Sequence, residues 1–214
     1  MKPQAVSGPW LSGPWLSGPW LSGEGGRPAA ARRDPALPEA VLFDRDGTLI
    51  EDVPYNGDPD AVRPMPGARA AVDAVRSAGV RVGVVSNQSG VARGLLTRDQ
   101  VDAVRLRVET LLGPFGVWAV CPHGPDDGCR CRKPAPGLIV AACGRLGVDP
   151  GRTVVIGDIG ADMAAAAAAD ARGVLVPTPV TLPEEVGAAT ETAHDLCAAV
   201  LKALGRAPGA GGAR

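Results

Sequence analysis

The sequence predicts a doubly wound α/β domain, in which helices cover both faces of a mainly parallel sheet. Two observations carry this prediction. From Ala40 onward, short runs rich in β-branched residues alternate with Ala-rich helical patterns, which is typical of βαβ units. A chain of 214 residues that is 45% apolar can also bury one sizeable core, so we expect a single catalytic domain.

The expected strands are short apolar runs that end at glycines or polar residues. They cover residues 40–44, 80–86, 117–121, 153–157 and 173–176. Each run has the length of a strand that is buried on both faces, as in a parallel sheet.

Helices are expected between these strands because apolar residues recur there at helical spacing. They run from Pro66 to Gly79, from Thr97 to Leu112, from Pro136 to Gly147, and through Met163 and the six alanines that follow it. Thr97 and Gln100 form a capping box, and Pro136 suits a first helical turn. The alanine run predicts close packing on the sheet.

The two ends of the chain are expected to lie outside the domain, which we place at residues 39–205. Residues 1–38 contain SGPWL three times in succession, and residues 206–214 form a short tail. Proline and glycine in every unit exclude a regular helix, so we expect both ends to be disordered. Trp10, Trp15 and Trp20 fit either a multivalent recognition tail or a neutral extension, and the neutral extension is the favoured hypothesis.

Composition excludes several classes of function. The net charge is −1 and no basic cluster stands out, so no nucleic-acid partner is expected. No apolar run is long enough to span a bilayer, and the N-terminus lacks the pattern of a signal peptide. We therefore expect a cytoplasmic monomer without a membrane partner, whose ligand is small.

The clearest chemical signal is a pair of carboxylates at the end of the first strand. Asp44 and Asp46 are two residues apart and so point to the same side, and Gly47 permits a tight turn after them. One carboxylate can attack phosphorus while the other handles protons. Ser86 and Asp158 also follow strands, and in open α/β sheets such strand ends form the ligand site. An ordinary solvated loop is the alternative for the Asp pair alone.

A second signal is a cluster of three cysteines and one histidine, namely Cys121, His123, Cys129 and Cys131. Four such ligands satisfy a tetrahedral Zn²⁺ without an open position, which indicates a structural zinc site. Reduced core cysteines are the alternative. The cluster directly precedes Lys133, so we expect the zinc to fix the loop that carries this lysine.

From about residue 40 to residue 180, these motifs resemble the haloacid dehalogenase (HAD) superfamily of aspartate-nucleophile phosphotransferases. The resemblance implies a Rossmann-like sheet, with Asp44 as nucleophile and Asp46 as general acid and base. Ser86 and Lys133 would hold phosphoryl oxygens. Mg²⁺ would bind the carboxylates of Asp44 and Asp158 and the backbone carbonyl of Asp46. Asp162 would orient Lys133 or the metal shell.

The cysteine cluster followed by Cys-Arg-Lys-Pro, together with the string from Ser86 to Gly94, narrows the resemblance to subfamily IIIA. This group contains phosphatases of the 7-phosphate of D-glycero-D-manno-heptose 1,7-bisphosphate and of histidinol phosphate. The resemblance implies a small phosphorylated sugar as substrate. The substrate-binding residues implied in this way are Asp52, Tyr55, Asn87, Gln88 and Arg132.

Two features keep alternatives open at this point. The short spacer between His123 and Cys129 is more similar to the histidinol-phosphate enzymes, and Ile159 stands where the family commonly carries a basic residue. The favoured function is a Mg²⁺-dependent heptose bisphosphate phosphatase. The alternatives are a histidinol-phosphate phosphatase or another small sugar-phosphate phosphatase and, outside enzymes, a zinc-stabilised binding protein without turnover. No segment is long enough for a large cap domain, so we expect an open site.

Overall fold

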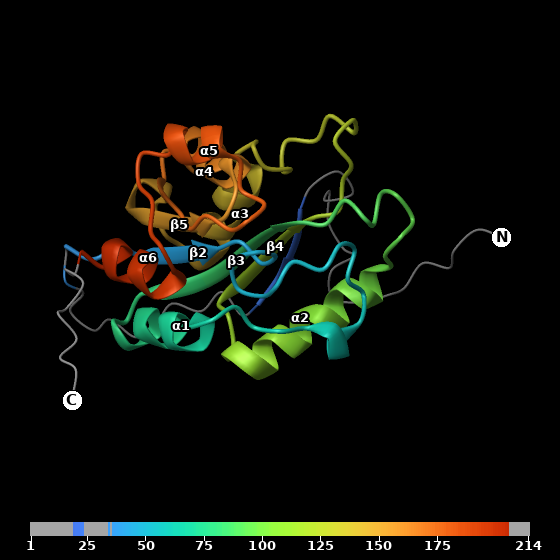
Figure 1. Ribbon diagram of the computed structural model, residues 1–214, viewed down its shortest axis with the longest axis horizontal. Helices are drawn as coiled ribbons and strands as arrows, with labels where there is room; N and C mark the ends of the chain where they lie inside the picture. Colours follow the sequence, from blue (N-terminus) through green and yellow to red (C-terminus); the bar gives the residue numbers. More distant parts are fainter. Residues whose placement is uncertain (1–18, 24–33, 35, 206–214) are drawn as a thin grey trace.

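The computed structural model describes residues 19–23, 34 and 36–205 of the chain. Within this part, the fold is built on a six-stranded sheet in the order β1-β4-β3-β2-β5-β6 (Figure 1). The strands are β1 (Trp20–Ser22), β2 (Ala40–Phe43), β3 (Arg81–Asn87), β4 (Val117–Cys121), β5 (Thr153–Gly157) and β6 (Arg172–Leu175). All neighbours pair in parallel except β1, which lies antiparallel to β4.

Helices cover both faces of the sheet (Figure 1). One layer contains α1 (Ala68–Ser77), α2 (Arg98–Leu112) and α6 (Leu196–Ala203); the other contains α3 (Gly137–Leu146), α4 (Gly160–Ala168) and α5 (Pro183–Ala188). Short 3-10 turns occur at Pro59–Ala61 and Pro150–Arg152. The doubly wound α/β architecture expected from the sequence is thereby confirmed.

The core has two halves because successive residues of a strand point to opposite faces. Val41 and Phe43 of β2 join the apolar cluster under α1, α2 and α6. Leu42, between them, joins the cluster under α3 and α4. The central strands are buried on both faces, which fixes their carboxyl ends rigidly at one edge of the sheet.

Most expected elements lie where the sequence places them. The strands β4 and β5 have the expected bounds, β2 ends one residue earlier than expected, and β3 and β6 are each shifted by one residue at both ends. The capping box of α2 is present: Thr97 Oγ1 accepts from the Gln100 amide at 3.2 Å, and Gln100 Oε1 accepts from the Thr97 amide at 2.9 Å. No bounds were predicted for α5 and α6.

One short segment differs from the expectation of disorder over residues 1–38. Trp20–Ser22 forms the edge strand β1, because the otherwise open edge of β4 offers backbone partners to any extended segment. The expectation of disorder over residues 1–18, 24–33, 35 and 206–214 falls outside the described residues.

Two further points concern the described part of the chain alone. The segment between β2 and α1 contains only one 3-10 turn, so it forms no separate cap domain. None of the helices found there has both the length and the apolar character needed to cross a bilayer.

Candidate phosphoryl-transfer site

The carboxyl ends of the parallel strands open into one pocket, here called the strand-end pocket. Its walls come from the turn after β2, the end of β3, the loop before α3 and the turn after β5. Most of the residues selected from the sequence line it, namely Asp44, Asp46, Asp52, Tyr55, Asn87, Gln88, Lys133 and Asp158. The topology therefore brings together residues that are up to 114 positions apart, from Asp44 to Asp158.

Lys133 lies at the floor of this pocket and is only 4% exposed. Its ammonium group donates to Asp44 Oδ1, to Asp162 Oδ1 at 2.5 Å and to the carbonyl of Val85 at 3.0 Å. An ammonium group has three donors, so all of them are used. Burial by itself would lower the pKa of Lys133, but the carboxylates of Asp162 and Asp44 outweigh burial and raise it. The lysine therefore stays charged.

Three buried carboxylates surround this single cation. Asp44, Asp158 and Asp162 each offer an oxygen, and these oxygens lie within 4.8 Å of one another. Burial, and then the charge of Asp162, raises the pKa of Asp158 to about 7; burial also raises the pKa of Asp44 well above its usual value, although Lys133 opposes it. One lysine does not balance three carboxylates, so the donor set fits a hard divalent cation such as Mg²⁺.

The turn after Asp46 is shaped to receive Asp158. Gly47 has a φ of +76°, and a Cβ atom at this position would collide with the Asp158 carboxylate. Thr48 Oγ1 donates to Asp158 Oδ1 at 3.2 Å. The sequence analysis used Gly47 only for the turn and did not select Thr48, whose contact depends on the pairing of β2 with β5.

Asp46 is held by donors other than Lys133. Arg45 binds its carboxylate through Nε at 2.9 Å and Nη2 at 2.8 Å. Gln88 Nε2 donates to Asp46 Oδ2 at 2.9 Å and to Ser86 Oγ at 2.8 Å. Gln88 thus links the ends of β2 and β3. Sequence reasoning missed Arg45, although its place between two selected aspartates was a usable signal.

Asn87 supports the lysine instead of pointing freely into the pocket. Its Nδ2 donates to the carbonyl of Lys133 at 3.0 Å, and its Oδ1 accepts from the Lys133 amide at 3.1 Å. Both ends of the side-chain amide are therefore engaged with the backbone of Lys133. No sequence signal reveals this contact, because the two residues are 46 positions apart.

The rim of the pocket is mostly apolar or uncharged. Tyr55, whose OH accepts from Arg93 Nη1 at 2.7 Å, lies there with Asp52, Ile159 and Val180. Burial raises the pKa of Asp52, and the charge of Asp46 adds to this effect.

Two selected residues do not line the strand-end pocket. Ser86 is almost fully buried and lines a smaller cavity behind β3. Arg132 donates through Nη1 to the carbonyl of His123 at 3.4 Å and is not among the pocket-lining residues. The substrate contacts expected for Ser86 and Arg132 therefore stay predictions.

The expected metal ligands Cys121, His123, Cys129 and Cys131 converge beside the loop that carries Lys133. Their sulfur atoms lie 3.3–3.7 Å apart, and His123 Nδ1 is 3.5 Å from Cys121 Sγ and 3.3 Å from Cys131 Sγ. Tetrahedral Zn²⁺ with Zn–S bonds of about 2.3 Å would space its sulfurs about 3.8 Å apart. The three cysteines form no disulfide, so together with His123 they provide four donors for a closed tetrahedral site.

Comparison with known proteins agrees with this geometry. A family profile described as HAD-hydrolase-like matches residues 130–204. The D-glycero-beta-D-manno-heptose-1,7-bisphosphate 7-phosphatase of Pseudomonas aeruginosa is 38% identical over 143 residues, covering 64% of this chain and 80% of the relative. The Yersinia pestis protein of the same name is 35% identical over 163 residues, covering 70% and 87%.

A solved structure shows the same relationship in three dimensions. The D,D-heptose 1,7-bisphosphate phosphatase of B. bronchiseptica, complexed with magnesium and phosphate, superposes with a TM-score of 0.69 at 31% identity. The alignment covers 77% of this chain and 97% of that chain. Matches at this identity over nearly the whole length of the relatives show that the chain belongs to the HAD-like hydrolase family, in the group that includes these heptose bisphosphate phosphatases.

Proposed function

We propose that the protein is a Mg²⁺-dependent phosphatase that removes the 7-phosphate of D-glycero-D-manno-heptose 1,7-bisphosphate through an aspartyl-phosphate. The observation that carries this proposal is the convergence of Asp44, Asp158 and Lys133 at the carboxyl edge of the sheet. The heptose bisphosphate phosphatases named above, matched over at least four-fifths of their length, support the choice of substrate.

In the first proposed step, an oxygen of Asp44 attacks phosphorus and the bond from phosphorus to the sugar oxygen breaks. Asp46 gives its proton to the departing alkoxide. Arg45 and Gln88 fix the direction of the Asp46 carboxyl group, which is 22% exposed and faces the pocket. This fixed direction suits a group that must deliver one proton to one oxygen.

In the second step, Asp46 takes a proton from water, and the water oxygen attacks the phosphorus of the aspartyl-phosphate. The bond from phosphorus to Asp44 then breaks, which releases phosphate and restores both carboxyl groups. Ser86 and Lys133 are the proposed partners of the other phosphoryl oxygens. The oxygen of Ser86 accepts from Gln88, so its own proton is available to donate.

Asp44 and Asp158, with the backbone carbonyl of Asp46, are the proposed ligands of Mg²⁺. When bound, this cation reduces the repulsion between the anionic nucleophile and the anionic substrate. Asp162 holds Lys133 in place and adds to the negative charge of the site. We propose Asp52, Tyr55, Gln88 and Arg132 as the substrate-facing set. Asn87, which was predicted to bind substrate, acts through the backbone of Lys133.

We also infer that Cys121, His123, Cys129 and Cys131 hold a structural Zn²⁺. The hydrogen bond between Cys131 and Cys121 lowers the pKa of Cys121 to about 5 and raises the pKa of Cys131, so it favours a thiolate on Cys121 alone; a bound Zn²⁺ would favour deprotonation of its other thiol ligands. We also propose a cytoplasmic location, because cysteines without disulfides are typical of a reducing compartment. We further propose a monomer with its catalytic domain at residues 39–205.

The test is phosphate release by the purified full chain with Mg²⁺. Heptose 1,7-bisphosphate, histidinol phosphate and fructose 1,6-bisphosphate are the substrates, and Asp44→Asn is the blank. We expect preferential release from the heptose ester, with the 1-phosphate retained in the phosphorus NMR spectrum. If the protein prefers histidinol phosphate, that ester replaces the heptose bisphosphate as the proposed substrate. If phosphate is released from none of the three esters faster than by Asp44→Asn, the catalytic proposal is overturned.

A further inference from the structure

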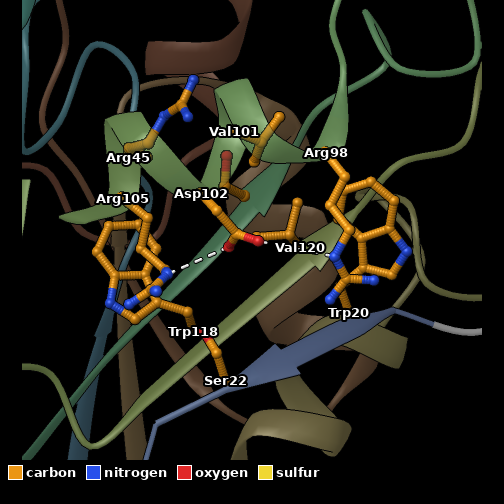
Figure 2. Close-up of a pocket in the computed structure, with 10 residues that line it drawn as sticks. Trp20, Ser22, Arg45, Arg98, Val101, Asp102, Arg105, Trp118 and Val120 are labelled. Carbon is orange, nitrogen blue, oxygen red and sulfur yellow. Dashed lines mark hydrogen bonds and ion pairs between the residues drawn. The ribbon is translucent and has the colours of Figure 1, made fainter. Parts of the chain in front are cut away.

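The edge strand β1 is seated on β4 by side chains of a particular kind. Trp20 pairs with Val120, and Ser22 pairs with Trp118. The indole of Trp20 lies against the guanidinium of Arg98, whose Cζ is 4.6 Å from the ring centroid. Figure 2 shows Trp20 and Ser22 on β1 beneath the side chains of α2, with Arg98 beside the indole.

Leu21 points to the opposite face of the sheet, as the alternation of a strand requires. There it packs against the apolar cluster under α3 and α4. The contacts of β1 thus extend to both faces: an aromatic residue and a small polar residue on one face, and an aliphatic residue on the other.

The residue after β1 must be glycine. Gly23 has a φ of +105°, and a Cβ atom there would lie 2.6 Å from the carbonyl oxygen of Gly116. The carbonyl of Gly23 also accepts from Arg145 Nη2 at 2.6 Å. These contacts define a groove formed by β4, Gly116, Arg98 and Arg145, here called the β1 groove. It accepts the sequence Trp-Leu-Ser-Gly.

The space left in the groove is too small for another ligand. The cavity beside Trp20 has a volume of about 10 Å³ for the centre of a water molecule, which is room for about one water. The cavity is also lined by Arg45 and Ser86, so a seated strand covers side chains that help to hold Asp46. The extended segment Trp20–Ser22 thus fills the groove almost completely.

The chain carries this four-residue sequence three times. Residues 10–13, 15–18 and 20–23 each read Trp-Leu-Ser-Gly, and each is preceded by Gly-Pro. The two earlier units therefore carry the same tryptophan, leucine and serine side chains and the same glycine as the seated unit. Seating an earlier unit lengthens the connection to β2 by five or ten residues, and the entropy of loop closure grows only slowly with length.

We propose that the β1 groove is a docking site for Trp-Leu-Ser-Gly and that the three repeat units of the same chain are interchangeable occupants. Docking adds a strand to the open edge of β4, so backbone hydrogen bonds supply affinity while the tryptophan and glycine supply selectivity. The repeat is then a redundant edge strand, which keeps the β4 edge covered when one unit is lost.

The test uses Gly→Val substitutions in the full chain, because a side chain at the glycine position blocks seating of that unit alone. Hydrogen exchange of the β4 amides that face β1 is measured by NMR, together with the unfolding temperature. Gly23→Val should keep amide protection within about twofold of the unmodified chain, because another unit takes its place. In the variant that combines Gly13→Val, Gly18→Val and Gly23→Val, the protection of these β4 amides should fall by about tenfold or more.

The control variant is Gly13→Val with Gly18→Val, which leaves the third unit intact and should retain full protection. Equal loss of protection in Gly23→Val and in the triple variant would show one fixed register and overturn the proposal. Full protection in the triple variant would show that the groove does not select glycine, which also overturns it. Protection of Gly23→Val that rises with protein concentration would identify a second copy as the occupant instead.

Discussion

Lys133→Met is the substitution that tests the electrostatics of the site most directly. Methionine keeps the length and flexibility of the side chain but removes the charge and the three donors. The carboxylates of Asp44 and Asp162, which Lys133 contacts, would then lie buried without a neighbouring cation. The backbone carbonyl of Val85 would also lose its 3.0 Å partner.

Removing one partner of a buried ion pair costs about 3–5 kcal/mol, because the remaining charge is left uncompensated. With a urea m-value of about 2 kcal/mol/M, the midpoint of unfolding should fall by about 1.5–2.5 M at pH 8. That loss is a large part of the total stability of about 5–15 kcal/mol that a domain usually has.

The loss should be smaller at pH 5. The folded-state pKa of Asp44 is already raised by burial, and removing Lys133 raises it further. A carboxyl group whose pKa is higher in the folded state than in the unfolded state stabilises the fold when it is protonated. As the pH rises from the unfolded-state pKa through the folded-state pKa, the group loses its proton and the free energy of unfolding falls. The unmodified chain should show the same trend to a smaller extent, because Lys133 stays charged at both pH values and opposes the rise in the pKa of Asp44.

The assay is urea unfolding of the full chain at pH 5 and pH 8 in buffer without added Mg²⁺. Lys202→Met, which removes an exposed lysine at the end of α6, is the matched control and should change stability by less than about 0.5 kcal/mol. A Lys133→Met variant with an unchanged midpoint at pH 8 would refute the reasoning, because the buried carboxylates would then not depend on the lysine.

Three other predictions concern the strand-end pocket and the cysteine cluster beside it. Gly47→Ala should weaken Mg²⁺ binding by about tenfold or more in calorimetry, because the added Cβ meets the Asp158 carboxylate. The control is Gly94→Ala, at a position that also has a positive φ of +69° but open space around it, and it should leave the Mg²⁺ affinity unchanged. Equal losses of affinity in the two variants would contradict this prediction. Burial raises the pKa of Asp158 in the metal-free protein to about 7, so protonation of Asp158 stabilises the metal-free fold and competes with Mg²⁺. Added Mg²⁺ should therefore raise the unfolding temperature more at pH 8 than at pH 6. Equal increases at the two pH values would exclude this linkage. Cys129→Ser should lower zinc content, unfolding temperature and turnover together. Cys197→Ser, which lies outside the cysteine cluster, should keep the zinc content measured by atomic absorption. Full turnover of Cys129→Ser without zinc would show that the cluster does not support the strand-end pocket.

The sequence predicted the central part of the fold well because its signals are local. The strands β4 and β5 are short apolar runs with clear ends, and the capping box of α2 needs only Thr97 and Gln100. Asp44 and Asp158 could be assigned to one site because each follows a strand, and the carboxyl ends of parallel strands share an edge. The convergence of the four zinc-type ligands was likewise readable from their spacing.

Other features could not be read from the sequence because they depend on contacts between distant segments. Asn87 was predicted to bind the substrate, yet its side-chain amide forms hydrogen bonds with the backbone of Lys133. Arg45 belongs to the site through its contact with Asp46. The edge strand β1 consists of only three residues, and a run of that length has no pattern of its own.

The sequence by itself therefore determined most of the strands and helices from β2 to β6, the residue types at the strand-end pocket, and the cluster of three cysteines and one histidine. Each of these is read from a local pattern of residues. The tertiary structure decided which side chains use their hydrogen bonds on one another and which ones face the pocket. It leaves Asp46 with Arg45 and Gln88, and it gives Asp44 and Asp162 to Lys133. The physical reason is that a side chain has few donors and acceptors, and packing of the sheet edge determines which partners lie within reach.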